Sequence, residues 1–422
     1  MTELSAILEA WRGLNAGDRD AVLATVVHVT GSAYRRPGAR MLIVPGGRRY
    51  GGVSGGCLEG EIARKAWWFT ESGAPVVRVY DTTSEDDAAW EFGLGCNGVV
   101  HVLLERASSP GASGLLDFLR ARLTARKCAV VATVIRTGAS ATVGVGDRLL
   151  VAEAPPDAAP DIGGTTDSDG FGRGTRACSS RGESPLSAGS LSGSGVESRL
   201  LPHIAAAFRE KKSRLAHIGE IDVFVEWIAP PPSLVVLGAG HDAIPLVNFA
   251  AQLGWNVTVA DGRSAYARPE RFPGADRVVV MPPGDFLRGV RIDSETLVVM
   301  MTHNYPLDSL LLPRILPLRP RYLGLLGPRA RAERLFSELR LPEPAFVHAP
   351  AGLDAGCDSP EAIALSIVAE IQAEMNSREG GKLKYRDEPI HTAAYEVGVA
   401  RQPMNVDAVR PSWCEVAERT HV

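Results

Sequence analysis

The sequence lacks an excess of positive charge, paired cysteines and any long apolar run. The chain of 422 residues carries 45 Lys and Arg against 49 Asp and Glu, which argues against a surface for non-specific binding of nucleic acid. No apolar stretch approaches the roughly 18 residues of a membrane span, and the initial MTELSAILEAWRGLNAGD has the pattern of an amphipathic helix, not of an export signal. The six cysteines form no CxxC pair, which favours reduced thiols and a cytoplasmic protein.

Three changes in composition indicate how the chain is organised. Residues 154–197 are rich in Gly, Ser, Asp and Pro and nearly free of large apolar side chains, which predicts a flexible insertion. The stretch APPPS at 229–233 is typical of a stiff spacer, and the chain becomes polar after residue 376. We therefore expect a first domain (1–153), the insertion (154–197), the rest of the first domain or a connector (198–230), a second domain (231–376) and a polar tail (377–422).

Apolar, β-branched runs alternate with helical segments along most of the chain. In the first domain AVLATVVHV, ARMLIV, PVVRVYD, GVVHVLLE, CAVVATVIRT, DRLLVAE and IDVFVEWI are typical of strands, with helices among them. From residue 233 the alternation of apolar strands and helices becomes regular. The sequence thus predicts an α/β protein: a mixed α/β first domain and a Rossmann-like, doubly wound parallel sheet in the second.

Two cysteines lie in glycine-rich loops of the first domain. In GGVSGGCLEGEI, Cys57 follows Gly55 and Gly56 and precedes a helix, whose free N–H groups would lower the pKa of a thiol. In EFGLGCNGVV, Cys96 stands between a glycine and an asparagine, just before a strand. A buried structural cysteine is the usual alternative, but two cysteines in such loops favour at least one functional thiol, either a catalytic nucleophile or a sulfur ligand of a metal.

An arginine-rich stretch precedes the first of these loops. TGSAYRRPGARMLIV combines Gly31 with Arg36 and Arg40, and glycine backbone together with guanidinium groups suits a phosphate. The alternative for Arg36 is an ordinary solvated side chain.

The second domain carries a loop of the dinucleotide-binding type. In LVVLGAGHDA, Gly238 permits a tight turn after an apolar strand, and Gly240, next to His241, lets a pyrophosphate approach the backbone at a helix start. Asp261 ends the next strand, where a carboxylate would accept from a ribose hydroxyl, and Arg263 would suit a 2′-phosphate or be a solvated arginine. NAD(P) is only one of the ligands that such a fold takes.

Polar side chains also follow three later strands. Because the carboxyl ends of parallel strands meet at one edge of a sheet, we expect these groups near the glycine loop. Any single histidine here is as readily a loop residue with a satisfied hydrogen bond, but three such strand ends together favour a ligand site. The candidates are His303, Asn304 and Asp308 after one strand, Gly327 and Arg329 after the next, and His348 and Asp354 after the third.

Together these motifs resemble the XdhC/CoxI family, accessory proteins of molybdenum hydroxylases such as xanthine dehydrogenase. The resemblance covers about residues 5–106 and 200–376 and rests on GSAYRRPGARMLI, GGVSGGCLEGEI, EFGLGCNGVV, VVLGAGHDA, MTHNYPLD, YLGLLGPRARAERL and HAPAGLDAGCDSPEAIALSIVAEI. The family commonly has Pro where Tyr34 stands and often Gly where Asn97 stands.

The resemblance implies two domains that face each other and bind molybdenum cofactor, as molybdopterin or its dinucleotide form. It further implies sulfuration of that cofactor by a cysteine desulfurase, delivery to the apo-enzyme of the hydroxylase, and a homodimer. Cys57 and Cys96 would then contact the metal or its dithiolene, while Arg36, Arg40 and the Gly238 loop would hold the pterin phosphate or the nucleotide.

Other functions remain open at this point. The motifs favour a cofactor-binding maturation factor over a catalyst. The alternative is an NAD(P)-dependent oxidoreductase in which His303 would be the acid or base. A third interpretation is a scaffold that binds the hydroxylase without touching the cofactor.

Overall fold

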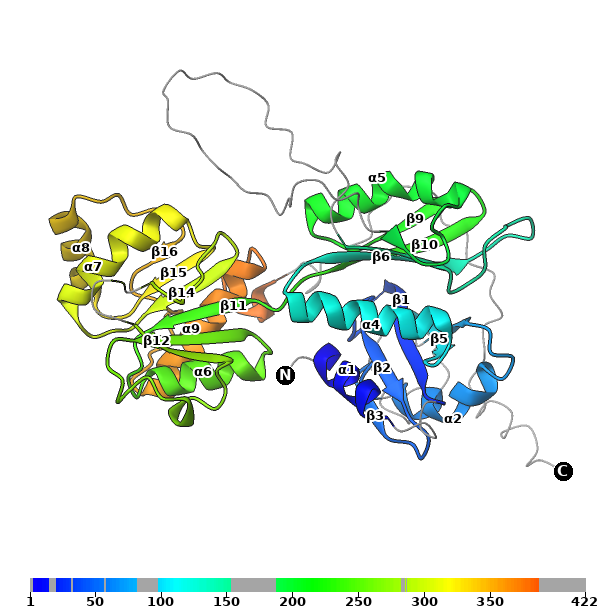
Figure 1. Ribbon diagram of the computed structural model, residues 1–422, viewed down its shortest axis with the longest axis horizontal. Coiled ribbons are helices and arrows are strands. Elements are labelled where there is room, and N and C mark those ends of the chain that lie inside the picture. The colour runs from blue at the N-terminus through cyan, green and yellow to red at the C-terminus, as the bar shows by residue number, and fades with distance from the viewer. Residues whose placement is uncertain are drawn as a thin grey trace, which may run out of the picture. The chain divides into compact units, whose positions relative to one another are not determined.

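The described part of the chain divides into two units, and Figure 1 labels many of their helices and strands. This computed structural model describes residues 3–14, 20–31, 33–56, 58–81, 98–152, 187–281, 285 and 287–386. The boundary between the units falls between Pro230 and Pro231, inside APPPS, and we call the described residues before and after it the N-terminal unit and the C-terminal unit. None of the helices described is long and apolar enough to cross a membrane.

Two antiparallel five-stranded sheets form the centre of the N-terminal unit. The first has the order β3-β2-β1-β5-β4 and consists of β1 (Val22–Gly31), β2 (Arg40–Ile43), β3 (Arg49–Gly51), β4 (Val76–Asp81) and β5 (Gly98–Arg106). The second has the order β8-β7-β6-β10-β9 and consists of β6 (Ala129–Arg136), β7 (Arg148–Val151), β8 (Ser187–Ala188), β9 (Arg214–Ile218) and β10 (Ile221–Ile228). The helices are α1 (Glu3–Gly13), α2 (Glu59–Phe69), α4 (Pro110–Ala125) and α5 (Gly195–Glu210). The mixed α/β class predicted for this region is confirmed.

The alternation of side chains along the strands decides which helix each face meets. In β1, Val22 and Ala24 pack with α2, whereas Leu23 lies on the opposite face, in a core with α1 and α4. In β6, Val130 packs with α5 and Val131 joins the same core as Leu23. Helix α4 therefore packs against both sheets, which makes them one folding unit. Each fully buried side chain of this kind contributes about 1.5–3 kcal/mol.

The two halves of this unit repeat one another. Among the described elements each half runs helix, three strands, helix, two strands, and the strand order of the second sheet follows that of the first. The register agrees as well, because Thr25 pairs with Arg40 in the first sheet and Thr133 with Arg148 in the second. The sequence keeps a trace of this relation in AVLATV at 21–26 and AVVATV at 129–134. The N-terminal unit is thus a tandem repeat.

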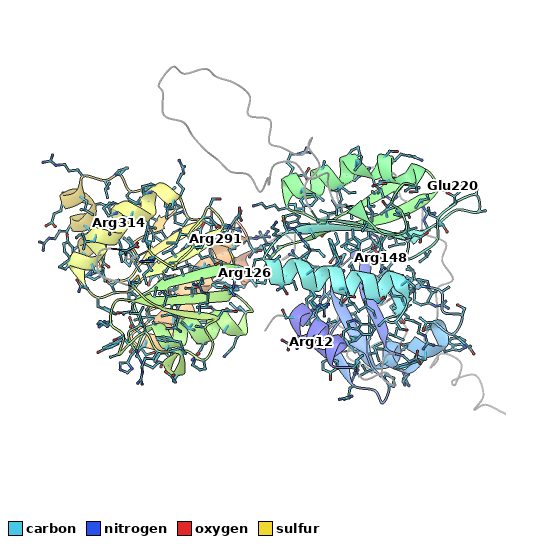
Figure 2. All side chains as sticks on the ribbon, viewed as in Figure 1. Arg12, Arg126, Arg148, Glu220, Arg291 and Arg314 are labelled. Carbon is cyan, nitrogen blue, oxygen red and sulfur yellow. The ribbon has the colours of Figure 1, made fainter. Side chains whose placement is uncertain are left out.

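Two buried ion pairs connect the repeats. Arg40 of β2 binds Glu226 of β10, and Arg148 of β7 binds Glu105 of β5 at 2.9 and 3.0 Å. Figure 2 labels Arg148, whose side chain is 2% exposed. In each pair the arginine comes from one sheet and the glutamate from the other, at equivalent positions of the two repeats. Because a buried charge without a partner is costly, these pairs restrict how the two sheets pack.

The predicted insertion ends earlier than the composition suggested. Residues 153–186 lie outside the described residues, but β8 and the first turn of α5 fall within 187–197 and belong to the second sheet and its helix. A Cβ on Gly189 would overlap the carbonyl oxygen of Arg148, and Leu191 is fully buried. The boundary predicted at residue 197 was wrong because tight turns and flexible linkers use the same residue types.

A parallel sheet with helices on both faces forms the C-terminal unit (Figure 1). Its order is β13-β12-β11-β14-β15-β16, and its strands are β11 (Ser233–Leu237), β12 (Asn256–Asp261), β13 (Arg277–Val280), β14 (Thr296–Met300), β15 (Tyr322–Leu325) and β16 (Val347–His348). The helices are α6 (Ala243–Gln252), α7 (Tyr305–Ile315), α8 (Arg329–Leu339) and α9 (Pro360–Met375), with 3₁₀ turns η3 (Pro269–Arg271), η4 (Leu316–Leu318) and η5 (Leu383–Tyr385). Helices α6 and α9 pack on one face, α7 and α8 on the other. The doubly wound sheet predicted from the sequence is confirmed.

The strand order reverses beside β11. The chain runs outward from β11 through β12 and β13, then crosses to β14 on the other side of β11. The loops after β11 and β14 therefore leave the same edge in different directions, and open parallel sheets bind ligands at such a reversal.

Candidate functional site

Three of the predicted motifs meet at one end of the first sheet. Gly31 ends β1 and pairs with Gly98, the first residue of β5. The segment after β1 carries Tyr34, and a Cβ on Gly55 would lie 3.5 Å from Cγ of its ring. Gly55 and Gly56 are exposed, so the backbone of this loop is open to solvent. The structure thus brings the GSAYRRPG segment, the glycine loop before α2 and the start of β5 together.

One carboxylate and one hydroxyl hold the loop before α2. Glu59 accepts from the N–H groups of Val53 and Ser54 at 3.0 and 2.7 Å, and from the Ser54 hydroxyl. The Ser54 oxygen in turn accepts from the N–H groups of Gly56 and Leu58. Burial alone would raise the pKa of Glu59, but the hydrogen bonds from Ser54 and the backbone outweigh it and lower the pKa. The carboxylate is therefore ionised, and the loop is fixed before any ligand arrives.

The two candidate thiols, Cys57 and Cys96, lie outside the described residues, although the described chain resumes within two residues of each. Among the described residues, Cys128 and Cys357 are not joined in disulfide bonds. Within that part no three His, Cys, Asp or Glu side chains are grouped to hold a metal ion. Metal contact by Cys57 and Cys96 thus stays a prediction.

The arginines expected at a phosphate have different surroundings. Arg40 is 5% exposed, and its two terminal nitrogens donate to Glu226 and to the Gly38 carbonyl oxygen. The terminal nitrogens of Arg40 are thus engaged by the protein itself, which favours a structural role, and contact of Arg40 with a phosphate stays a prediction. Arg36 is exposed, and it stays a candidate.

The turn after β11 is the predicted glycine loop of the C-terminal unit. Gly238 has a φ of +119°, and a Cβ there would overlap the carbonyl oxygen of Met301 after β14, so glycine is required. A Cβ on Gly240 would overlap the carboxylate of Asp242, and His241 is exposed. The turn leads into α6, whose first N–H groups lie beside the reversal of strand order and suit an anion.

His303 lies across from this turn, in the loop after β14. Its φ of +52° is in the left-handed region, and its Nε2 lies 2.6 Å from the Asp242 carboxylate. The side chains of His303 and Asp242 are 62% and 20% exposed. A solvent-open histidine held by a carboxylate can exchange protons or, when protonated, bind an anion, and strained backbone clusters at functional sites. Asn304 caps α7, its Oδ1 accepting from the N–H of Leu307 at 3.0 Å.

Asp261 ends β12 and is occupied by the chain itself. One oxygen accepts from the N–H of Ala239 and from Nη2 of Arg263, and the other from the N–H and Nε of Arg263, all at 2.7–3.0 Å. Burial alone would raise the pKa of Asp261, but these hydrogen bonds outweigh it and lower the pKa. Asp261 therefore fastens the glycine turn to β12, and the predicted contact with a ribose hydroxyl would require Arg263 to leave.

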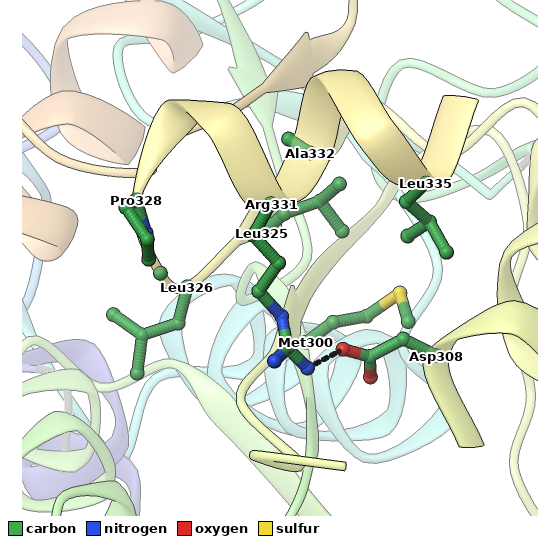
Figure 3. A pocket seen from close by; sticks show the side chains of 9 residues that line it. Met300, Asp308, Leu325, Leu326, Pro328, Arg331, Ala332 and Leu335 are labelled. Carbon is green, nitrogen blue, oxygen red and sulfur yellow. Dashed lines mark hydrogen bonds and ion pairs between the residues drawn. The ribbon is translucent and has the colours of Figure 1, made fainter. Parts of the chain in front are cut away.

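Figure 3 shows a small pocket after β14 and β15, with Gly327 in its wall. Within it Asp308 accepts from Thr302 at 2.5 Å and from Arg331 at 2.6 Å. The pocket measures about 10 Å³, which suits a single water molecule. Arg331 approaches it, whereas Arg329 is 79% exposed and pairs along its own helix. This cavity is too small to hold a nucleotide.

His348 has other partners. Its ring stacks on Tyr322 at 4.4 Å, and its Nδ1 lies 3.4 Å from Glu370. Glu370 also accepts from the Tyr322 hydroxyl at 2.5 Å and from the N–H of Gly352 at 2.9 Å. His348 thus has the surroundings of a satisfied structural histidine. Asp354 is exposed in the loop after β16.

Known proteins match this chain over both units. The family described as "XdhC and CoxI family" matches residues 14–81, and "XdhC Rossmann domain" matches residues 234–371. A protein of Bacillus subtilis (strain 168), named as a probable xanthine dehydrogenase subunit, is 31% identical over 370 residues, which are 88% of this chain and 96% of that protein. The chain belongs to the XdhC and CoxI family.

The likeness to XdhC proteins extends to a solved structure. A crystal structure from Bacillus halodurans, described as a xanthine dehydrogenase, has a TM-score of 0.70 at 29% identity and covers 92% of this chain and 98% of its own. The protein YqeB of Escherichia coli (strain K12) is 28% identical over 234 residues, 50% of this chain and 42% of YqeB. The two XdhC matches include the glycine loop before α2 and the turn after β11.

Sequence reasoning missed three carboxylates that hold candidate residues in place. Glu59 falls in the first turn of a helix, where an acidic side chain is favourable. Asp242 directly precedes α6, where an acidic side chain is favourable as well. Glu226 interrupts the apolar strand IDVFVEWI, and a charge in a buried strand requires a partner.

Proposed function

We propose that the protein is an accessory factor for the maturation of a xanthine dehydrogenase-type molybdenum hydroxylase. In this role it binds molybdenum cofactor, supports its sulfuration and delivers it to the apo-enzyme. The observation that carries the proposal is the meeting of Gly31, Tyr34 and the Gly55–Gly56 loop at one end of the first sheet, directly beside the positions of Cys57 and Cys96 in the chain. The name of the Bacillus subtilis relative supports xanthine dehydrogenase as the class of client.

The described residues of the N-terminal unit fit such a ligand. The exposed backbone at Gly55 and Gly56 is held in place by Ser54 and Glu59, so a ligand meets a loop that is already ordered. The helix that follows favours a thiolate at its start, and thiolates are soft metal ligands. When bound, the cofactor supplies the molybdenum centre of the client enzyme. Cys57 and Cys96 would hold it through the metal or the dithiolene.

The C-terminal unit offers a second fitting feature, a place for a phosphate or nucleotide. The glycine turn leads into the first N–H groups of α6, and the exposed His303 contacts Asp242 just before that helix. The carboxylate of Asp242 would repel an anion there, and its contact with His303 reduces that repulsion when the imidazole is protonated. We propose that Gly238, Gly240 and His303 bind the phosphate end of a ligand.

The proposed partners follow from this role. They are the apo-hydroxylase, which receives the cofactor, and a cysteine desulfurase, which supplies the sulfur. We also propose a homodimer in the cytoplasm, where the thiols stay reduced.

Reconstitution tests the proposal. The protein is mixed with molybdenum cofactor, separated from free cofactor by gel filtration and added to apo-hydroxylase. Wild type and Cys128→Ala should restore hydroxylase activity, whereas Cys57→Ala and Cys96→Ala should restore less. Equal recovery of hydroxylase activity with all four proteins would show that the two thiols are not needed. Binding of the client enzyme without any transfer of cofactor would indicate a scaffold.

A second candidate function is an NAD(P)-dependent oxidoreductase. The observation in its favour is the His303–Asp242 pair next to the glycine turn, since an imidazole oriented by a carboxylate suits proton transfer beside a hydride donor. A change in nicotinamide absorbance that requires His303 would support this function. Lack of nicotinamide binding by the wild-type protein would exclude it.

A further inference from the structure

The carboxylate at the end of β12 has no acceptor position left for a ligand. An ionised carboxylate offers about four lone-pair positions. Asp261 uses two on each oxygen, for the N–H of Ala239 and for three donors of Arg263. A ribose diol recognised by this carboxylate would therefore have to displace a bidentate guanidinium and expose a buried charge.

At the end of β12 the group exposed to solvent is the guanidinium of Arg263, not the carboxylate of Asp261. The Arg263 side chain is 52% exposed, and its guanidinium carbon lies 4.0 Å from the centre of the Tyr266 ring. Arg271 lies 5.1 Å from the centre of the same ring and donates to the carbonyl oxygen of Ala239 in the glycine turn at 2.7 Å. Two arginines thus stand around one aromatic ring next to the turn, and Asp261 and Tyr266 fix the orientation of Arg263.

We propose that Arg263 makes the site at the glycine turn selective for a nucleotide that carries a phosphate on the ribose reaching β12, in preference to one with a free ribose diol. The inference rests on the part of the proposed function that assigns phosphate binding to the glycine turn. A planar guanidinium binds two phosphate oxygens side by side, and the pair with Asp261 holds it at the strand end where the ribose of a bound dinucleotide lies.

Two nucleotides that differ only in this phosphate test the inference. Isothermal titration calorimetry compares 2′-phospho-ADP-ribose with ADP-ribose on the full-length protein. Wild type should bind the phosphorylated nucleotide about 10- to 100-fold more tightly, as one charge-assisted contact predicts. Arg263→Ala should lose this preference and gain affinity for ADP-ribose, because Asp261 regains free acceptor positions.

Matched variants distinguish a loss of nucleotide preference from a loss of folding. Arg268→Ala removes another arginine of the same loop and should keep the wild-type preference, and Arg263→Lys should give an intermediate ratio. Should Arg263→Ala not fold, the lysine variant carries the test. Equal binding of the two nucleotides by wild type, binding of neither, or an unchanged ratio in the Arg263 variants would overturn the inference.

The outcome is independent of the cofactor experiment. A nucleotide preference together with failed reconstitution would refute the accessory role alone. Successful reconstitution without a nucleotide preference would refute this inference alone.

Discussion

Arg148→Met should destabilise the N-terminal unit by about 3–5 kcal/mol, the usual cost of removing one partner of a buried ion pair. Arg148 and Glu105 are 2% and 1% exposed, and Arg148 also donates to the carbonyl oxygen of Gly111 at 2.7 Å. Methionine fills much of the volume of the arginine stem, so the loss is mainly that of leaving the Glu105 carboxylate buried without a counter-charge. Adding Glu105→Leu removes that charge as well and should recover most of the loss.

Differential scanning calorimetry measures the effect, with the transition of the C-terminal unit as internal reference. For a unit of this size each kcal/mol corresponds to about 2–4 °C, so Arg148→Met should lower the melting temperature by about 6–20 °C. The tandem repeat predicts a loss of similar size for Arg40→Met. Arg120→Met is the control, because it breaks a pair with Asp117 that is 48% and 61% exposed and costs less than about 1 kcal/mol. A loss for Arg148→Met no larger than this control would refute the reasoning.

Three further predictions concern a thiol, a histidine and a turn. Iodoacetamide should label Cys57 faster than Cys128, with protection by bound cofactor; equally slow labelling in peptide mass spectrometry would mark Cys57 as an ordinary packed thiol. Burial lowers the pKa of His101 to about 4, whereas the pKa in the unfolded chain is about 6.5. The unfolded chain therefore binds the proton more readily, and up to about 3 kcal/mol of stability that is present above pH 6.5 is lost as the pH falls to 4. Urea unfolding of His101→Phe should show a flatter pH dependence in that range, and an unchanged slope would contradict the assignment. Gly238→Ala should destabilise the C-terminal unit by about 2 kcal/mol or more, whereas Gly60→Ala, at an open helical position, should be neutral or stabilising by up to about 1 kcal/mol; thermal melts compare the two.

The C-terminal sheet could be predicted because its central strands are buried on both faces. Such strands read as unbroken apolar runs, for example SLVVL and TLVVM, bounded by turn residues. The glycine turn is equally visible, since Gly238 is required by a close approach to the backbone at Met301. Local chemistry is sufficient to locate both features.

The tandem repeat of the N-terminal unit was not predicted, although the sequence contains the similar segments AVLATV and AVVATV. The segments that follow differ between the halves, because residues 153–186 separate β7 from β8 where only a short turn separates β2 from β3. Strand patterns identify each strand by itself. They do not indicate that two sets of strands share one order.

The partners of the candidate site residues could not be predicted from the sequence. Arg40 resembles a phosphate ligand in the sequence, yet its partner Glu226 lies 186 positions later and in the other sheet. Asp261 resembles a ribose acceptor, yet Arg263 already fills its acceptor positions. Which charges pair depends on the tertiary structure and cannot be read from spacing along the chain. This pairing decides which groups remain available to a ligand.

The molybdenum content of the purified protein tests the proposed role of the thiols most directly. The metal is measured per polypeptide by elemental mass spectrometry after expression in cells that make the cofactor, for wild type, Cys57→Ala, Cys96→Ala and Cys128→Ala. We predict bound molybdenum in wild type and Cys128→Ala and a clear loss in the other two variants. The same molybdenum content in all four proteins, or none in wild type, would contradict the proposal.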